Sequence, residues 1–396
     1  MLVVLGLLSA VAPLATDLYL PVFTDLAADL RAGAAGVQLT LTAFLVGLAV
    51  GQLVIGPLSD RYGRRRPILL ATAAALAACV LCALAPNIWT LVALRFVHGF
   101  AGSAGIVIGR AVAADLVTGR AAARIFSLLA SVVGIAPVVA PLAGGALAPA
   151  GWRAEFWVLA GISAVMLAGS ALVVPETLPR ERRHAGGLAA TGRTVRRLFG
   201  DRGYVGYAFS FAFGFGGLMS YISASPFVVQ NVLGLSRTAY TVTFAANALG
   251  MTLTGLVGAR LVRRFSPEVL LRTGQALVLG LSVVLLAMLA AGLPVAVVLP
   301  VLFVLVSSFT LIMGNASALT VGRAPYATGT AAAVMGALQF ALGALVSPLV
   351  GLGGEDTGLP MGVTLVVSAL LGIGARLLTR GLPEAGPATA EAPAQG

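Results

Sequence analysis

Long apolar runs follow one another along almost the whole chain, separated by short polar segments. Each run holds about 20 predominantly apolar residues, which is the length that an α-helix needs to cross the hydrocarbon core of a bilayer. The expected spans cover residues 2–23, 37–58, 67–85, 88–108, 121–148, 156–174, 204–229, 239–261, 269–290, 295–316, 327–352 and 361–378. The pattern therefore predicts an all-α membrane protein with twelve transmembrane helices.

Matching landmarks divide these spans into two halves. Three landmarks of the first half recur about 205 residues later, as expected of a parallel repeat: Pro21 with Pro226, Gly56 with Gly258, and Pro141 with Pro348. Functional sites of duplicated membrane bundles lie between the repeats. We expect two six-helix pseudo-repeat bundles over 1–175 and 204–380, a polar linker over 176–203, and a disordered tail, rich in Ala, Pro and Glu, over 381–396.

The composition agrees with a chain that lies mostly in lipid. Hydrophobic residues make up 59% of it, the mean hydropathy is +1.00, and only 10% of the residues are charged. Soluble domains carry about 25% charged residues. The membrane part is therefore expected to be nearly the whole protein, with no room for a separate soluble domain.

The basic residues are distributed unevenly between the two sides of the predicted membrane. All 25 are arginines; 20 of them fall in loops on one side and three in loops on the other. Positive residues concentrate in cytoplasmic loops, so the Arg-rich side and both termini are predicted to be cytoplasmic. The net charge of +11 does not indicate nucleic acid as a partner, because the arginines form no continuous basic face.

The turn between the second and third spans carries the most specific string, GPLSDRYGRRR over residues 56–66. A cluster that only sets topology would account for the arginines but not for the glycines and the acid. The string resembles the loop motif of the major facilitator superfamily, which implies that small residues let helices approach and that charges pin one conformational state. The residues concerned are Gly56, Asp60, Arg61, Gly63, Arg64 and Arg65, with Asp115 as the expected partner of the cluster.

Two further strings resemble motifs of the superfamily's drug:proton antiporters. In LRFVHG over 94–99, Arg95 occupies membrane depth, where a charge costs about 2.5 kcal/mol or more; the resemblance implies that it assists proton coupling. His98 stands where Gln is more usual, and a neutral hydrogen-bonding His is favoured over a titrating one. In the fifth span, the second string contains Ala140, Pro141, Gly144 and Gly145, with Ala140 in place of a common Gly.

Three shorter strings narrow the resemblance: TDLYLP over 16–21, GWR over 151–153 and SASPF over 223–227. Together they resemble the bicyclomycin and chloramphenicol resistance (Bcr/CflA) branch of drug exporters, nearly end to end. The resemblance implies a multi-pass protein of the bacterial inner membrane that exchanges drug-like molecules for protons. A proton-coupled uptake symporter of the same superfamily is the alternative.

Asp17 is the expected proton carrier, because it is an acid within the apolar part of the first span and removal from water favours its neutral form. Arg95 is its expected charged partner. The alternative is that Asp17 is an interfacial residue solvated from outside. Polar and aromatic residues in the spans are candidates for the substrate site, although aromatic residues also pack or face lipid: Tyr19, Tyr207, Phe211, Phe215, Tyr221, Asn247 and Gln339.

Other classes of protein fit the chain less well. A membrane-embedded enzyme would need clustered acids, histidines or cysteines, and the chain has two histidines and two cysteines. Cys79 and Cys82 are expected to be packing residues, because a zinc site needs about four ligands. We therefore expect no enzymatic activity, no metal and no cofactor; the expected partners are a small drug-like substrate, protons and the lipid bilayer, and the chain is expected to act as a monomer.

Overall fold

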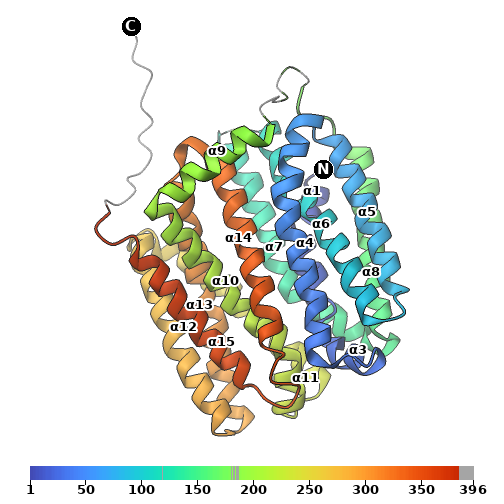
Figure 1. The fold of residues 1–396 in the computed structure, drawn as a ribbon, viewed down its shortest axis with the longest axis vertical. Coiled ribbons are helices and arrows are strands. Elements are labelled where there is room, and N and C mark those ends of the chain that lie inside the picture. Colours follow the sequence, from blue (N-terminus) through green and yellow to red (C-terminus); the bar gives the residue numbers. More distant parts are fainter. Residues whose placement is uncertain (118, 180, 182, 184–186, 383–396) are drawn as a thin grey trace.

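The computed structural model describes residues 1–117, 119–179, 181, 183 and 187–382, and the described part is helical almost throughout, with no strand. Figure 1 shows long helices standing side by side. Their bounds, with short 3-10 or π segments written η, are α1 Leu2–Ser9, α2 Val11–Asp17, η1 Leu20–Val22, α3 Phe23–Asp29, α4 Gly33–Tyr62, α5 Arg65–Ala83, α6 Ile88–Leu116, α7 Gly119–Leu147, η2 Ala148–Ala150, α8 Trp152–Val173, α9 Gly187–Gly200, α10 Arg202–Phe227, η4 Val228–Val232, α11 Arg237–Leu261, α12 Pro267–Ala290, α13 Val295–Gly322, η5 Pro325–Ala327, α14 Thr328–Leu349 and α15 Leu359–Leu377.

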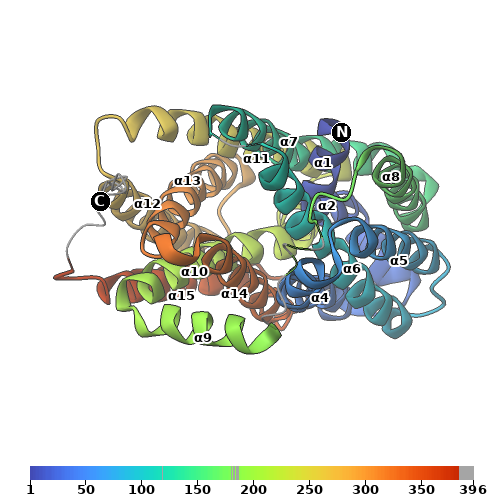
Figure 2. The same ribbon diagram turned by 90° about the horizontal axis from the view of Figure 1, so that it is seen from above.

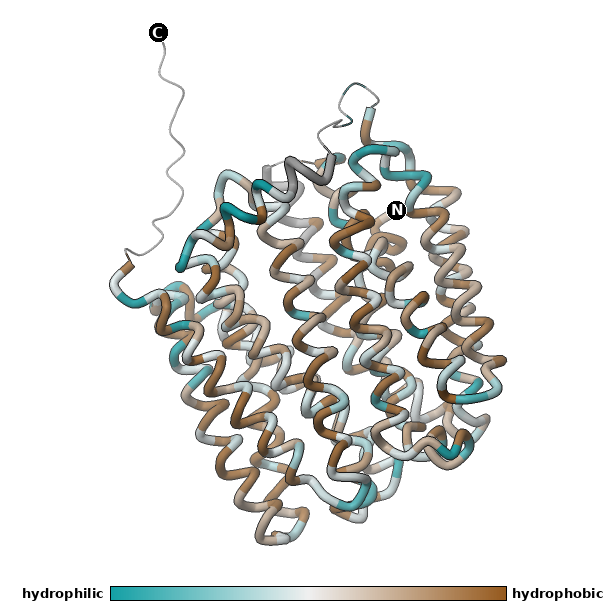
Figure 3. Tube along the Cα trace, in the orientation of Figure 1, coloured by the Kyte–Doolittle hydropathy of each residue, from teal (hydrophilic) through white to brown (hydrophobic). Residues whose placement is uncertain are grey.

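The predicted all-α membrane architecture is confirmed. Within the described residues, 11 helices are long and apolar enough to cross a membrane, or 12 when the bent pair at the N-terminus counts as one span. Figure 3 shows apolar residues along the helix shafts and polar residues gathered at their ends. The predicted tail over 381–396 lies, from residue 383 on, outside the described residues.

The first span is broken, whereas the sequence predicted one continuous helix over residues 2–23. Its two parts, Leu2–Ser9 and Val11–Asp29, meet at an angle of 50°. The ring of a proline collides with the carbonyl four residues earlier and offers it no N–H. Pro13 acts in this way on Ser9, where α1 ends, and Pro21 acts on Asp17, where α2 ends. The sequence therefore places the Asp17 side chain at a helix end within the bundle.

The helices form two groups that meet along two seams. In the first half α4 packs on α6 and α5 packs on α8, and in the second half α10 packs on α14 and α15. Between the halves, α4 contacts α14 and α7 contacts α11, and Figure 2 shows both seams from above. The predicted linker contains α9, which contacts α10 and α14 at one end of the bundle (Figures 1 and 2).

The two ends of the bundle are distinct. We call the end with α9 and the α4–α5 turn the α9 face, and the end with α3 and the start of α4 the α3 face (Figure 1). At the α9 face, Leu198 of α9 is fully buried in a small apolar cluster with Tyr204, Ala324 and Ala331. This packing fixes α9 across the ends of the second-half helices.

Candidate functional site

A cavity of about 330 Å³ lies between the two halves. Helices of both halves line it, and most of its wall is apolar or aromatic. A hollow of this size and character can hold a small organic molecule. The polar side chains in its wall include Thr16, Asp17, Gln52, Arg110, Tyr221 and Gln339.

The cavity extends from the middle of the bundle toward the α9 face. Three of its lining residues lie within two helical turns of helix ends at that face: Arg110 of α6, Ser317 of α13 and Ala332 of α14. At the α3 face, polar contacts join the halves instead. Both carboxylate oxygens of Asp25 lie 2.6 Å from Nη2 of Arg237.

Further polar contacts join the two halves near the α3 face. Nε2 of Gln38 donates to the carbonyl oxygen of Ser223 at 3.2 Å, and the Ser347 hydroxyl lies 3.5 Å from the carbonyl oxygen of Gln38. The structure is thus closed at the α3 face, with its cavity directed toward the α9 face.

Asp17 lies in the wall of this cavity at the end of α2, with 3% of its surface exposed. The hydroxyl of Thr16 lies 2.9 Å from Oδ1 of Asp17. No described residue forms an ion pair with it. A buried carboxylate is costly without a partner, so binding a proton or a hydrogen-bond donor at this position relieves that cost.

Arg95 does not pair with Asp17, contrary to the sequence-based expectation. Its side chain is fully buried behind α2, where Nη2 donates to the carbonyl oxygen of Ala15 at 2.9 Å. The guanidinium also lies over three aromatic rings, with its central carbon 4.2 to 5.8 Å from their centroids: Phe44, Tyr19 and Phe156. Such contacts favour a buried cation. Arg95 therefore holds the backbone two residues before Asp17, not its carboxylate.

His98 is a neutral hydrogen-bonding residue in this arrangement. Nη1 of Arg95 lies 3.1 Å from Nδ1 of His98. An arginine can only donate, so Nδ1 must accept and the ring proton is placed on Nε2. Nε2 faces the sulfur of Cys79 at 3.4 Å. This geometry favours the neutral alternative for His98 and makes Cys79 part of a buried polar chain.

Four of the predicted substrate residues line the cavity, and three do not. Phe211, Phe215, Tyr221 and Gln339 lie in its wall. Asn247 lies behind Tyr221 and donates to its hydroxyl oxygen at 2.8 Å. The hydroxyl of Tyr19 lies 2.9 Å from that of Thr40, in the buried core of the first half.

Tyr207 shares a helix face with Phe211 but lies one turn nearer the α9 face. There its hydroxyl donates to Glu268 of α12. Helical spacing alone could not show where along α10 the cavity stops. Tyr207 is therefore placed outside the cavity.

Two charged residues of the helices, one of which lies in the cavity wall, were not selected by the sequence analysis. Arg110 lines the cavity, whereas the sequence analysis did not assign it a role. Glu155 is fully buried in the first turn of α8, and neither carboxylate oxygen has a hydrogen-bond partner within the described part of the chain. The predicted sixth span began one residue later, which hid Glu155. In the sequence, the only indication for Arg110 and for Glu155 was a charged residue at the edge of a predicted span.

The glycines of the fifth-span motif permit close approach beside Asp17. A Cβ on Gly144 would lie 1.8 Å from the carbonyl oxygen of Leu18, and one on Gly145 would lie 2.7 Å from the hydroxyl of Thr241 in α11. Ala140 is buried in the same helix, one residue before Pro141. This part of α7 therefore packs against both the broken first span and the second half.

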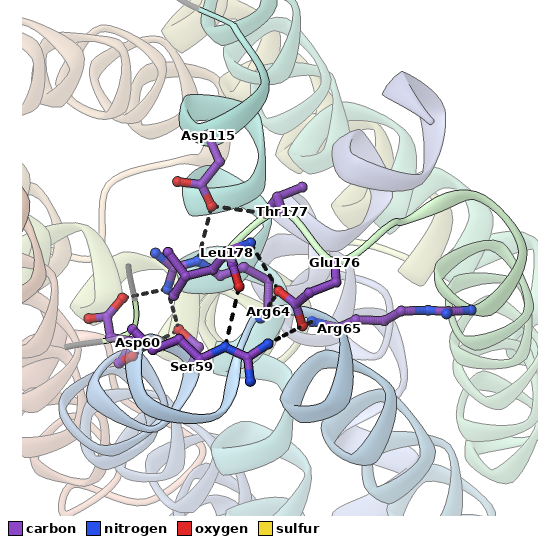
Figure 4. A network of polar contacts seen from close by, with 10 residues as sticks. Ser59, Asp60, Arg64, Arg65, Asp115, Glu176, Thr177 and Leu178 are labelled. Atoms are coloured by element: carbon purple, nitrogen blue, oxygen red, sulfur yellow. Dashed lines mark hydrogen bonds and ion pairs between the residues drawn. The ribbon is translucent and has the colours of Figure 1, made fainter. Parts of the chain in front are cut away.

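Arg64 is the centre of the polar network at the α4–α5 turn (Figure 4). Nη1 of Arg64 contacts the carboxylate of Asp60 and donates to the Ser59 hydroxyl at 2.7 Å, and Nε lies 3.2 Å from Oδ2 of Asp115. The expected contact between Asp115 and this cluster is present. Thr177 donates to the same Asp115 oxygen at 2.9 Å. The network thus ties α4, α6 and the segment after α8 together.

Glu176 is a part of this network that the sequence analysis missed. Although burial raises its pKa, backbone N–H groups of Arg64, Leu178 and Arg65 and the charge of Arg183 together hold the pKa of Glu176 below its usual value. Gly63 has φ of +90°, and a Cβ there would lie 2.3 Å from Oε2 of Glu176. Glycine is therefore required both by the backbone and by the packing.

Two predicted members of the loop cluster differ from Arg64 in their surroundings. Arg61 is exposed, and its guanidinium lies over the ring of Tyr62 at 5.3 Å. Arg65 is also exposed, and its Nη2 donates to the carbonyl oxygen of Ala171 at 2.8 Å. Gly56 lies within α4, where a Cβ would meet only a side-chain methyl of Val107 at 3.5 Å.

Comparisons with known proteins place these features in a family. Residues 5–348 match the Major Facilitator Superfamily. The "Uncharacterized MFS-type transporter YdgK" of Bacillus subtilis is 38% identical over 93% of this chain and 92% of its own. The "Bicyclomycin resistance protein homolog" of Haemophilus influenzae is 34% identical over 92% of this chain and 93% of its own.

A solved structure shares the fold at low sequence identity. The xylose transporter XylE from E. coli, in a partially occluded inward open conformation, superimposes with a TM-score of 0.75 over 98% of both chains, at 15% identity. The fold, the loop motif and the similarity over nearly the full length lead to one conclusion. This chain is a multi-pass membrane transporter that belongs to the major facilitator superfamily, in its bicyclomycin and chloramphenicol resistance (Bcr/CflA) branch.

Proposed function

We propose that the protein exports small, drug-like molecules in exchange for protons, across the bacterial inner membrane. The observation that carries this proposal is the position of Asp17, a buried carboxyl without an ion-pair partner among the described residues, in the wall of a cavity between the halves. A relative named for bicyclomycin resistance supports the choice of substrate class. The cavity lies within one chain, which supports a monomer as the transport unit.

The α9 face is the cytoplasmic side in this proposal. Most of the arginines follow helix ends at this face, as the positive-inside rule requires, and both termini are then cytoplasmic. The structure accordingly corresponds to the stage that takes a drug from the inner side, since its contacts close the α3 face. Labelling with an impermeant reagent at either terminus of intact cells would contradict this orientation.

Exchange follows if drug and proton compete at Asp17. A drug that favours the deprotonated carboxylate drives the proton off on the inner side, and a proton that arrives from outside weakens drug binding there. Arg95 contributes by fixing the backbone before Asp17 through Ala15. The network around Arg64 contributes by holding α4, α6 and the segment after α8 in one arrangement.

The test is transport by the purified full chain in proteoliposomes. An imposed pH gradient, acidic on the side of the α3 face, should drive the drug toward that acidic side, and dissipating the gradient with a protonophore should stop the movement. Drug movement in the same direction as the protons would favour uptake symport instead. A drug-susceptibility panel in an efflux-deficient host supplies the substrates for this assay.

A further inference from the structure

Arg110 offers an uncompensated positive charge to the cavity. It belongs to α6, its side chain is exposed there, and it lines the cavity. In the part of the chain that the structure describes, no carboxylate lies within ion-pair distance of it. The nearest acid along its helix, Asp115, contacts Arg64 and Thr177 instead. The Arg110 guanidinium is thus available to a molecule in the cavity.

The net charge of the cavity wall depends on the protonation state of Asp17. Asp17 and Arg110 are the only charged residues that line the cavity among those described. The wall is therefore neutral when Asp17 is ionised and carries one positive charge when Asp17 is protonated. An organic cation would meet a wall of no net charge in the first state and a repulsive wall in the second, and apolar surroundings strengthen this repulsion.

The aromatic residues of the wall do not reverse this preference. Aromatic rings that surround a ligand can bind cations, but here the rings pack on one another. Tyr221 stacks on Phe244 with centroids 5.5 Å apart, and Phe215 meets Phe340 edge to face at 5.6 Å. Their faces are partly occupied, so they offer apolar contact more than a cage for a cation.

We propose that Arg110 makes the cavity selective for the charge of its substrate. The cavity binds uncharged molecules that carry hydrogen-bond acceptor groups such as carbonyl or nitro, and it rejects organic cations. An acceptor of the substrate binds the Arg110 guanidinium, while a hydroxyl or amide N–H of the same molecule donates to Asp17. Hydrogen bonds to charged groups are stronger than those between neutral groups. The donor contact favours ionised Asp17, so an uncharged molecule can compete with the proton.

This inference rests on the proposed function for its role in exchange, but its test uses equilibrium binding alone. The full chain in detergent is titrated with two probes of similar molecular mass, uncharged chloramphenicol and the monocation tetraphenylphosphonium. The wild type should bind chloramphenicol at least about tenfold more tightly. Arg110→Gln should weaken chloramphenicol by about tenfold, as expected of one lost charge-assisted hydrogen bond, and strengthen the cation. Arg110→Lys should keep the preference against the cation.

Arg263→Gln is the matched control, because Arg263 is exposed at the α9 face and does not line the cavity. It should bind both probes as the wild type does. Equal affinity of the wild type for both probes, no binding of chloramphenicol, or an Arg110→Gln variant with unchanged selectivity would each overturn the proposal. Selective binding together with absent gradient-driven transport would instead contradict proton-coupled export and leave the role of Arg110 standing.

Discussion

Gly144 of α7 lies directly against the backbone of Leu18, so closely that an added Cβ would be 1.8 Å from the Leu18 carbonyl oxygen. Leu18 follows Asp17 at the point where α2 ends. The contact therefore joins the fifth-span motif to the break in the first span, which positions Asp17, the candidate proton carrier. It gives a structural reason for glycine at this position that does not depend on helix flexibility.

Replacing this glycine should disturb the site through packing alone. Gly144→Ala must push α7 away from a backbone carbonyl, which cannot yield as a flexible side chain would, and overpacking of this kind costs about 1–3 kcal/mol. We expect a melting temperature several degrees lower in detergent and export reduced at least tenfold in proteoliposomes. Gly134→Ala is the control, because a Cβ added to Gly134 in the same helix would have nothing within 4 Å. Equal behaviour of the two variants would contradict the close-packing role.

The Arg64 network should affect transport more than binding, because its residues lie at the α9 face and do not line the cavity. Asp60→Asn and Arg64→Ala should each reduce export strongly, while drug affinity in detergent stays within about twofold, which is less than one hydrogen bond contributes. The measurement pairs equilibrium binding with gradient-driven export. Arg66→Ala is the control, since Arg66 is exposed beside the network. Normal export by Arg64→Ala would exclude a conformational role for this loop.

Glu176 should make the stability of this network dependent on pH. Its pKa in the folded protein is held below its usual value, chiefly by backbone donors that outweigh burial. A lowered folded-state pKa gives stability that is present above the unfolded-state pKa, near 4.3, and lost as the pH falls through the folded-state value. Glu176→Gln should therefore lower the melting temperature at pH 7 by roughly 2 °C, for about 1 kcal/mol.

The difference between Glu176→Gln and the wild type should shrink as the pH approaches 3, because the wild-type carboxyl is then increasingly protonated. Melting curves in detergent at several pH values measure this convergence. Glu181→Gln controls for the loss of a negative charge in the same segment, since Glu181 is exposed. A constant difference between pH 7 and pH 3 would show that the Glu176 charge does not stabilise the turn.

Apolar runs of membrane-spanning length were sufficient to predict the helical fold, but not the break in its first span. The window over residues 2–23 is predominantly apolar and indicates one helix. Pro13 and Pro21 remove hydrogen bonds at Ser9 and Asp17, but the residues around them keep the mean hydropathy of the window high. The sequence contained the information, in the positions of the prolines relative to the helix ends. An apolar window is insensitive to it, since hydropathy does not register a missing N–H.

The candidate site was predictable in its chemistry and less so in its geometry. Helical spacing brought Phe211 and Phe215 to the cavity but included Tyr207, which contacts Glu268 instead. Arg110 was overlooked because a charge near the end of an apolar run can face lipid headgroups, protein or a cavity, and only packing between the halves decides which. Spacing along one helix cannot show which neighbouring helix covers a given turn.

Asp17 should carry an exchanged proton. A carboxylate buried without a cationic partner is costly, and the only polar side chain that contacts its oxygens among the described residues is that of Thr16. A proton or a drug donor can relieve this cost, but both cannot occupy the same oxygen, and in the proposed mechanism this competition is the origin of exchange. Asp17→Asn keeps an acceptor oxygen yet cannot release a proton. It should bind an uncharged drug, lose at least nine-tenths of pH-driven export, and still allow slow downhill movement of the drug.

Asp17→Glu should retain partial coupling, while Asp356→Asn, at an acid of the α14–α15 loop that does not line the cavity, should export normally. Gradient-driven export by Asp17→Asn at the wild-type rate would remove Asp17 from the mechanism and move attention to Glu155, a second buried acid of the first half, whose carboxylate oxygens have no hydrogen-bond partner among the described residues.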